Sequence, residues 1–199
     1  MTYTREQFVT KYSPFIEKTV KGTGILTGTV VAQAILESQG KTADGSYKVG
    51  ASKLAKEANN YFGIKCTGWN GKTYNIDTGE YTSTGQFYTE KASCFRAYPS
   101  IEDSIEDYVN FLKTNPRYEK AGVFKAKTVK QQAEALKSAG YATAPNYAST
   151  VESIYNNLKN HIAEATKNKL NFAKQYWWVI LLGTAGIAGI VYASVKLKK

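Results

Sequence analysis

Apolar residues recur at helical spacing along both flanks of the chain. The segment 27–38 places four of them on one face of a helix: Val30, Val31, Ala34 and Ile35. Ser100 is a helix-capping residue type, and the segment after it, "IEDSIEDYVNFLKTN", carries one apolar stripe. Thr128 with Gln131 opens a further helix. The same spacing predicts a last helix from its apolar positions Tyr147, Val151, Ile154, Leu158 and Ile162.

The first twenty residues carry two helix-start signals. Thr4 with Gln7 has the form of a capping box. Ser13 before Pro14 has the form of an N-cap followed by proline at the first helical position. These signals predict two short helices before Gly22.

Residues 65–98 have a different pattern. They are rich in Thr, Tyr and Gly, show short alternating runs, and carry a turn signal at Asn70-Gly71. This pattern predicts a small antiparallel sheet inserted in a mainly helical domain. The expected fold class is therefore α+β, with a cleft between the helical body and the β-lobe.

A long apolar segment lies near the C-terminus. Residues 176–195 are uncharged, and a helix of that length spans a hydrocarbon core of roughly 30 Å. Aromatic residues flank one end and lysines the other: Tyr176, Trp177, Trp178, Lys196, Lys198 and Lys199. A buried core helix is the alternative, but the all-round apolar character favours a transmembrane helix. The flanking lysines leave its orientation open, and small residues at four-residue spacing allow self-association: Ala185, Gly189 and Ala193.

The predicted organisation follows from these boundaries. Residues 1–165 form one domain, 166–175 a basic linker, 176–195 the transmembrane helix and 196–199 a basic tail. The N-terminal segment "MTYTREQFVT" lacks the apolar core of a secretory signal.

The charge balance narrows the class of partner. The net charge is +10, and without the three terminal lysines 23 basic and 16 acidic residues leave +7. An anionic polymer or a membrane surface fits this balance. Nucleic acid is not expected, because the lysines are dispersed and no zinc finger or phosphate-binding loop accompanies them.

Histidine and cysteine are too scarce for most metal or nucleophile chemistry. The sequence has one histidine, His161, and this excludes metal sites that need two histidines. His161 lies in a lysine-flanked stretch that is expected to be a solvated helix face. Two cysteines, Cys66 and Cys94, are too few for a zinc cluster, and they either pair or remain reduced thiols. Neither a metal nor a cofactor is expected.

The candidate chemistry lies in carboxylates. Glu37 ends the helix 27–38, where the helix dipole disfavours negative charge. It is either a solvated surface residue or a carboxyl that keeps its proton as a general acid. Asp77 or Glu80 on the β-lobe is the candidate for a second carboxylate on the other side of the cleft. Glycoside hydrolases use such a pair of carboxyl groups, one on each side of the bond that they cleave.

Five motifs occur in an order that is similar to one enzyme family. They are "AQAILES" (32–38), "NNYFGIK" (59–65), "TGEY" (78–81), "FRAYPSIEDSIEDYVNFLKTNPRY" (95–118) and "YATAPNYA" (141–148). Over about residues 5–160 the chain resembles the glucosaminidases of glycoside hydrolase family 73, which include autolysins, flagellar peptidoglycan hydrolases and phage lysins. The resemblance implies a lysozyme-like fold.

The resemblance also implies roles for individual residues. Glu37 matches the catalytic proton donor, and Glu80 matches the second carboxyl in the β-lobe. Tyr141 matches a tyrosine that lines the cleft. In the family, one short segment shapes the glycan groove, and the residues that match it here are Asn60, Tyr61, Phe62 and Gly63.

The sequence departs from the family pattern at two places and carries a pair of cysteines beside the β-lobe. After the catalytic Glu many members have "SGWG", whereas "SQGKTADG" here lacks the Trp, so the sugar contacts there differ. Ala144 replaces a common Asp, which removes a local turn contact but no catalytic group. Cys66 and Cys94 flank the β-lobe, where a disulfide would tie its two ends together.

The expected function is that of a membrane-anchored peptidoglycan hydrolase that binds glycan strands. It would cleave the β-1,4 bond between N-acetylglucosamine and N-acetylmuramic acid, with Glu37 as general acid. The alternatives are a lytic transglycosylase of the same fold and a catalytically silent glycan-binding or structural protein of a membrane or virion. The expected location is a bacterial envelope, with the domain facing the wall, or the membrane of a phage particle.

Overall fold

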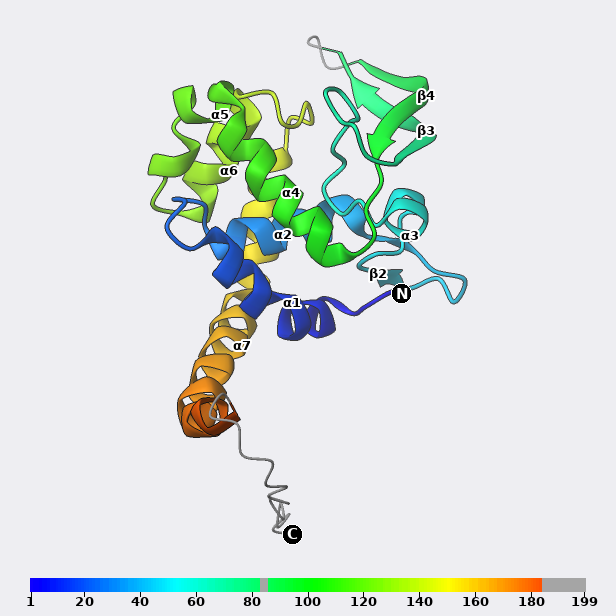
Figure 1. Ribbon diagram of the computed structural model, residues 1–199. Coiled ribbons are helices and arrows are strands. Elements are labelled where there is room, and N and C mark those ends of the chain that lie inside the picture. The colour runs from blue at the N-terminus through cyan, green and yellow to red at the C-terminus, as the bar shows by residue number, and fades with distance from the viewer. Residues whose placement is uncertain (83–85, 184–199) are drawn as a thin grey trace. The chain divides into compact units, whose positions relative to one another are not determined.

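Helices dominate the part of the chain that the structure describes. The computed structural model describes residues 1–82 and 86–183, except the side chains of residues 80, 81, 87 and 168–183. The helices are α1 Arg5–Val20, α2 Thr27–Ser38, α3 Lys53–Ala58, α4 Ile101–Thr114, α5 Pro116–Lys120, the 3-10 turn η1 Val123–Lys125, α6 Val129–Ser138 and α7 Tyr147–Gly183 (Figure 1). The strands are β1 Gly40–Lys41, β2 Tyr47–Lys48, β3 Thr73–Tyr81 and β4 Phe87–Arg96.

Two compact units make up the chain. The first is Met1–Thr166 and the second is Lys167–Lys199, and helix α7 runs across the boundary. The first unit holds the hydrophobic core and both antiparallel strand pairs. It therefore has the mixed α+β character that the sequence pattern predicts.

Helix α2 lies inside the hydrophobic core. Its bounds confirm the prediction for 27–38, but residues 28–35 are all buried, not just one face. The difference arises because both α1 and α6 pack against α2. Apart from Thr27 at its start, the helix becomes half-buried at Leu36 and Glu37 in its last turn. The polar end of an otherwise buried helix thus reaches the protein surface at one defined place.

The capping residues behave as predicted. The hydroxyl of Ser100 accepts a hydrogen bond from the backbone N–H of Asp103, and that of Thr128 accepts one from Gln131. Both bonds satisfy N–H groups that have no partner within the helix. The boundaries of α4 and α6 are therefore set locally.

The prediction of two helices before Gly22 is wrong. The capping box at Thr4 opens α1, but α1 then continues through Pro14 to Val20 as a single helix. The Ser13 hydroxyl is buried and has no hydrogen-bond partner, so it caps nothing. Core packing on both sides of the proline, by Tyr12 and Ile16 among others, outweighs the backbone hydrogen bond that proline removes.

The predicted β-lobe is an antiparallel hairpin. Strands β3 and β4 pair from Thr73–Arg96 to Tyr81–Phe87, with an irregularity between Ile76 and Thr78. An isolated two-stranded hairpin is only marginally stable in water. Contacts at the base of the hairpin must therefore hold it against the helical body.

Five short elements were not predicted from the sequence. The strands β1 and β2 have two residues each, the helices α3 and α5 have six and five, and the 3-10 turn η1 has three. Elements this short carry too few apolar positions for a periodicity to emerge. They fill the connections that follow α2 and α4.

The predicted transmembrane helix falls mostly outside the described residues. Residues 176–183 form the end of α7, while 184–195, the tail 196–199 and the small-residue stripe Ala185, Gly189 and Ala193 are not described. A search of the described helices finds none that is both long and apolar enough to cross a bilayer. The membrane helix stays a prediction.

Candidate active site

A groove of about 1260 Å³ runs along the first unit. The β3–β4 hairpin lies on one side of it and α5 and α6 on the other (Figure 1). Its lining comes from the last turn of α2, the start of α3, segment 62–69, β3, helices α4 and α5, and segment 140–150. The groove therefore collects side chains from parts of the sequence that are far apart.

Glu37 lines this groove from the last turn of α2. The helix ends at Ser38, whose hydroxyl donates to the Ala34 carbonyl at 2.5 Å and accepts from the Gly50 N–H at 3.1 Å. These bonds fix the helix end that carries Glu37. The Glu37 carboxyl is thus held by a rigid element, as precise chemistry requires.

Gly63 keeps the space beside the Glu37 carboxyl open. Its φ of +65° is a left-handed conformation that favours glycine, and an added Cβ would lie 3.9 Å from Oε2 of Glu37. Any longer side chain at this position would crowd the carboxylate. Gly63 therefore leaves room for a substrate atom to approach Glu37.

Three tyrosines surround Glu37 on the side of the core. Burial raises the pKa of Tyr108, Tyr141 and Tyr147 well above the usual range, and the nearby charge of Glu37 adds to this. The phenol of Tyr141 donates a hydrogen bond to the Phe62 carbonyl at 2.6 Å. These phenols therefore stay neutral at any physiological pH, and Tyr141 and Tyr147 line the groove without adding charge to it.

Gln33 links two of these tyrosines beneath Glu37. Its amide N–H donates to the Tyr147 oxygen at 2.5 Å, and its carbonyl accepts from the Tyr108 hydroxyl. Gln33 is fully buried, one helical turn before Glu37. The sequence analysis missed it, although a polar residue on a buried helix face is a signal for such a bond.

The segment 60–63 has one end in the core and the other in the groove. The Asn60 amide bonds to the carbonyls of Ile64 and Arg96 and accepts from two backbone N–H groups. Tyr61 stacks on Phe8 in the core with ring centroids 6.0 Å apart. Neither Asn60 nor Tyr61 lines the groove, whereas the lining does include Phe62 and Gly63.

Of the two candidate carboxylates in the β-lobe, Asp77 and Glu80, the structure describes the side chain of Asp77. The backbone of Glu80 pairs with Tyr88 in the hairpin, but its side chain lies outside the described residues. Asp77 lines the groove, accepts from Lys91 Nζ at 2.7 Å and from the Ala92 N–H at 2.9 Å. The hydrogen bond from Lys91 is the main cause of the lowered pKa of Asp77. Asp77 is therefore an ionised carboxylate already engaged by a lysine.

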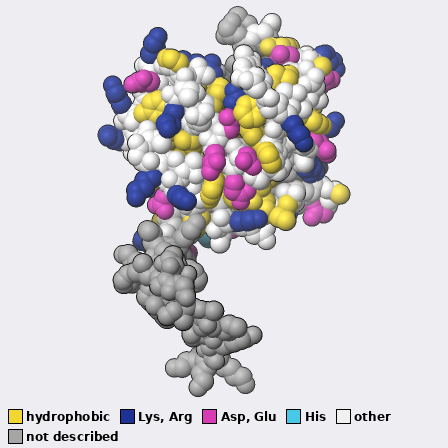
Figure 2. All heavy atoms as spheres, in the orientation of Figure 1, with side chains coloured by type: hydrophobic (Ala, Val, Ile, Leu, Met, Phe, Trp, Pro, Cys, Tyr) yellow, Lys and Arg dark blue, Asp and Glu magenta, His cyan; other side chains and the backbone are white. Residues whose placement is uncertain are grey.

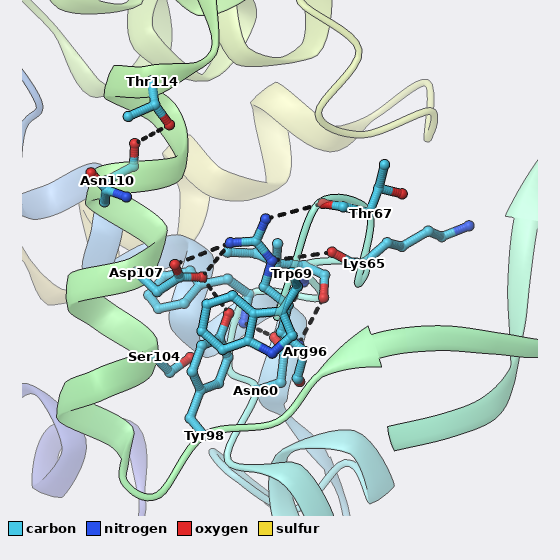
Figure 3. Close-up of polar contacts among 12 residues, drawn as sticks. Asn60, Lys65, Thr67, Trp69, Arg96, Tyr98, Ser104, Asp107, Asn110 and Thr114 are labelled. Carbon is cyan, nitrogen blue, oxygen red and sulfur yellow. Dashed lines mark hydrogen bonds and ion pairs between the residues drawn. The ribbon is translucent and has the colours of Figure 1, made fainter. Parts of the chain in front are cut away.

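A buried ion pair ties the hairpin to helix α4. Arg96, at the end of β4, donates to both carboxylate oxygens of Asp107 at 3.0 and 2.8 Å, and the Tyr98 hydroxyl donates to the same carboxylate at 2.6 Å (Figure 3). The Arg96 and Asp107 side chains are only 11% and 13% exposed. The guanidinium also lies over the ring of Trp69, 4.9 Å from its centroid. This cluster, which the sequence analysis missed, fixes one wall of the groove.

Cys66 and Cys94 form a disulfide in the structure. Their Cα atoms are 5.5 Å apart, and the Cys66 N–H donates to the Cys94 carbonyl at 3.0 Å. The bond joins segment 62–69 to strand β4, beside the Arg96–Asp107 pair. Together with the ion pair, this disulfide connects the base of the hairpin to the groove wall.

Metal ligands do not gather in the described part of the chain. No group of three or more His, Cys, Asp or Glu side chains among those residues is placed to hold a metal ion.

A helical body, a β-hairpin lobe and an acid-bearing groove between them define a lysozyme-like α+β domain. The crystal structure of a peptidoglycan hydrolase mutant from Sphingomonas sp. A1 is similar, with a TM-score of 0.63 and 30% identity. The similarity covers 80% of this chain and 99% of that one.

The sequence comparisons identify the family. The family described as glucosaminidase, mannosyl-glycoprotein endo-beta-N-acetylglucosaminidase, matches residues 13–160. This chain belongs to that glycosidase family, the glucosaminidases of glycoside hydrolase family 73.

Two curated relatives illustrate the similarity. The peptidoglycan hydrolase FlgJ of Salmonella typhimurium is 39% identical over 137 residues, which is 68% of this chain and 40% of FlgJ. The exo-glucosaminidase LytG of Bacillus subtilis is 33% identical over 133 residues, which is 65% of this chain and 43% of LytG. The chain thus spans less than half the length of these relatives.

Proposed function

We propose that this protein hydrolyses the glycan strands of peptidoglycan at the β-1,4 bond between N-acetylglucosamine and N-acetylmuramic acid. The observation that carries the proposal is the place of Glu37. It stands at the rigid end of a buried helix, lines the groove of a glucosaminidase domain, and faces the open space beside Gly63. Curated relatives include proteins named peptidoglycan hydrolase and exo-glucosaminidase.

In the proposed mechanism Glu37 is the general acid. Its carboxyl gives a proton to the glycosidic oxygen while the bond from that oxygen to the anomeric carbon breaks. Positive charge develops on the sugar ring, and water then adds to the anomeric carbon and releases a proton. The Tyr147 phenol can donate its O–H to the sugar, whereas the Tyr141 oxygen, whose O–H is bonded to the Phe62 carbonyl, can only accept. Both phenols are neutral and bring no competing charge.

We propose Glu80 as the second carboxyl. Residues 76–79 of strand β3 line the groove, and Glu80 follows them directly. A carboxylate there would either stabilise the positive sugar ring or activate the attacking water. The acetamido group of the substrate is the other candidate for this step. Asp77 is less suited, because Lys91 already engages it.

Product analysis tests the reaction. Purified peptidoglycan is digested with the full chain in mild detergent, the new reducing ends are converted to sugar alcohols with borohydride, and the products are weighed by mass spectrometry. We expect N-acetylglucosaminitol ends and fragments that have gained one water. N-acetylmuramitol ends would assign the other glycosidic bond. Anhydro ends would identify a lytic transglycosylase, and intact strands would favour a silent glycan-binding protein.

We further propose that residues 176–195 anchor the protein in a membrane, either in a bacterial envelope or in a phage particle. The support is twenty uncharged residues that begin with an aromatic cluster and are followed by three lysines in the last four residues. Such a segment inserts whatever the surface charge of the lipid.

Flotation with zwitterionic vesicles in high salt tests the anchor. We expect the full chain to float with the vesicles, because salt screens surface adsorption but not insertion. A variant with Leu181→Lys and Ile187→Lys should stay at the bottom of the gradient, while Lys167→Gln, outside the segment, should float. Flotation of the doubly charged variant would contradict the anchor.

A further inference from the structure

Arg117 has an unusual setting among the basic residues of the groove. It is the second residue of α5, and its side chain is exposed at the groove wall. One guanidinium nitrogen donates to the hydroxyl of Tyr118 at 2.6 Å. The guanidinium also lies 4.7 Å from the centroid of the Tyr118 ring and 6.0 Å from that of Phe111. A buried tyrosine and a second aromatic ring therefore orient this cation.

Two other cations of the groove already have carboxylate partners, while a third, Lys53, lies exposed at the start of α3. Arg96 pairs with Asp107, and Lys65 pairs with Glu90. Within the described ranges 1–82 and 86–183, Arg117 forms no ion pair. A guanidinium has five N–H donors in a planar fork, and the bond to Tyr118 uses one of them. Arg117 is thus oriented by aromatic side chains and keeps donors for an anion.

The space next to Arg117 is kept free by a glycine. Gly140 has a φ of +75°, and a Cβ added there would lie 3.8 Å from the Nη1 nitrogen of Arg117. A side chain longer than alanine at position 140 would therefore contact the guanidinium, and glycine keeps this side of Arg117 uncovered.

The charged side chains on the surrounding surface favour the binding of an anion on the α5 side of the groove. Figure 2 shows acidic side chains over α4 and basic side chains along the edge occupied by α5 and α6. The acidic residues over α4 are Glu102, Asp103 and Glu106, and the exposed lysines along the α5–α6 edge are Lys120, Lys125, Lys127 and Lys130. That edge also carries the exposed acids Glu119 and Glu134, so its lysines outnumber its acids. An anionic group is therefore attracted to the α5 side, where Arg117 lies.

We propose that Arg117 binds a carboxylate of the stem peptide that muramic acid carries. This inference rests on the proposed function, because it assumes that peptidoglycan occupies the groove. When muramic acid bears its peptide, the sugars of the strand are uncharged and the carboxylates lie on the peptide. A guanidinium fork fits a carboxylate by two parallel hydrogen bonds. Arg117 would make the groove prefer strands that still carry acidic stem peptides.

The test combines one substitution with one change to the substrate. Peptidoglycan carboxylates are converted to amides with carbodiimide and ammonium, which leaves the glycan strand intact. On untreated peptidoglycan we expect Arg117→Gln to lower kcat/KM about tenfold, mainly through KM. On the amidated substrate the wild type and Arg117→Gln should have the same kcat/KM, since the carboxylate partner is gone.

Two matched variants separate charge recognition from structural damage. Lys113→Gln removes an exposed charge of α4 that does not line the groove, and it should change kcat/KM less than about twofold on either substrate. Tyr118→Phe removes the hydroxyl that orients Arg117, so it should weaken the preference for untreated peptidoglycan. Equal losses by Arg117→Gln on both substrates, or no loss on either, would overturn the proposal.

If the protein does not cleave peptidoglycan, a binding measurement still tests the carboxylate site at Arg117. If the wild type cleaves neither substrate, sedimentation of the protein with untreated and amidated peptidoglycan measures recognition alone. Wild type should then bind the untreated material about tenfold more tightly, and Arg117→Gln should bind both equally. Equal binding of wild type to both materials would overturn the carboxylate site whatever the catalytic outcome.

Discussion

Glu37→Gln is expected to lower the kcat of peptidoglycan cleavage by about 10³-fold. Glutamine has nearly the shape of glutamate but cannot give a proton to the glycosidic oxygen. Substrate contacts along the groove remain, so KM should change little. The loss is measured as the rate of new reducing ends released from purified peptidoglycan by the full chain.

The control for this substitution is Glu57→Gln. Glu57 is an exposed carboxylate of α3 that does not line the groove, so its loss should leave the rate unchanged. The thermal unfolding of Glu37→Gln should match that of the wild type, because α2 is held by core residues and by Ser38. Wild-type rates in a folded Glu37→Gln variant would refute the proposed role.

Glu80→Gln then separates the two proposals for the second step. A large loss of kcat, comparable to that of Glu37→Gln, is expected if Glu80 stabilises the cation or activates water. A small loss, with retention of the anomeric configuration in the product, would assign the step to the acetamido group of the substrate. The anomeric form is read by NMR immediately after cleavage.

Asp107→Ala is expected to lower the free energy of unfolding by about 3 kcal/mol. The substitution leaves the Arg96 guanidinium nearly buried without its counter-ion and removes the acceptor of the Tyr98 hydroxyl. For a domain of this size the melting temperature should fall by about 6–12 °C. Urea unfolding followed by circular dichroism measures the change.

The neighbouring carboxylate provides the matched control. Glu106 is exposed on the same helix, and Glu106→Ala should change stability by less than about 0.5 kcal/mol. The double variant Arg96→Met with Asp107→Leu should lose less than Asp107→Ala alone, since no charge is left unpaired. Equal losses for Asp107→Ala and Glu106→Ala would show that the ion pair does not hold the hairpin.

The helices illustrate what a local pattern can predict. The bounds of α2 and the caps at Ser100 and Thr128 follow from apolar spacing and from side chains that bond to nearby backbone N–H groups. Pro14 shows the limit of this reasoning. A local breaker signal was overridden by core contacts on both sides of it, and those contacts involve distant residues.

Some residues of the candidate site could also be predicted from the sequence, and others could not. Glu37 was identified from its position at a helix end and from the motif order, and the structure places it in the groove. The motif order also identified Tyr141, but not its bond to a carbonyl 79 positions earlier. Gln33, which bonds to a tyrosine 114 positions later, was not identified. No periodicity or spacing rule connects positions that far apart.

By itself the sequence determined the α+β class, most of the long helices, the hairpin lobe, the family, and the candidate acid Glu37. These features depend on local spacing, capping and motif order, which can be read along the chain. Only the tertiary structure decided that Asn60 and Tyr61 lie behind the groove wall and that Arg96 and Asp107 hold the hairpin. It also decided that Arg117 has no carboxylate partner among the residues that the structure describes. Those outcomes depend on which side chains meet when the chain closes on itself, because burial and pairing are set by contacts between distant segments.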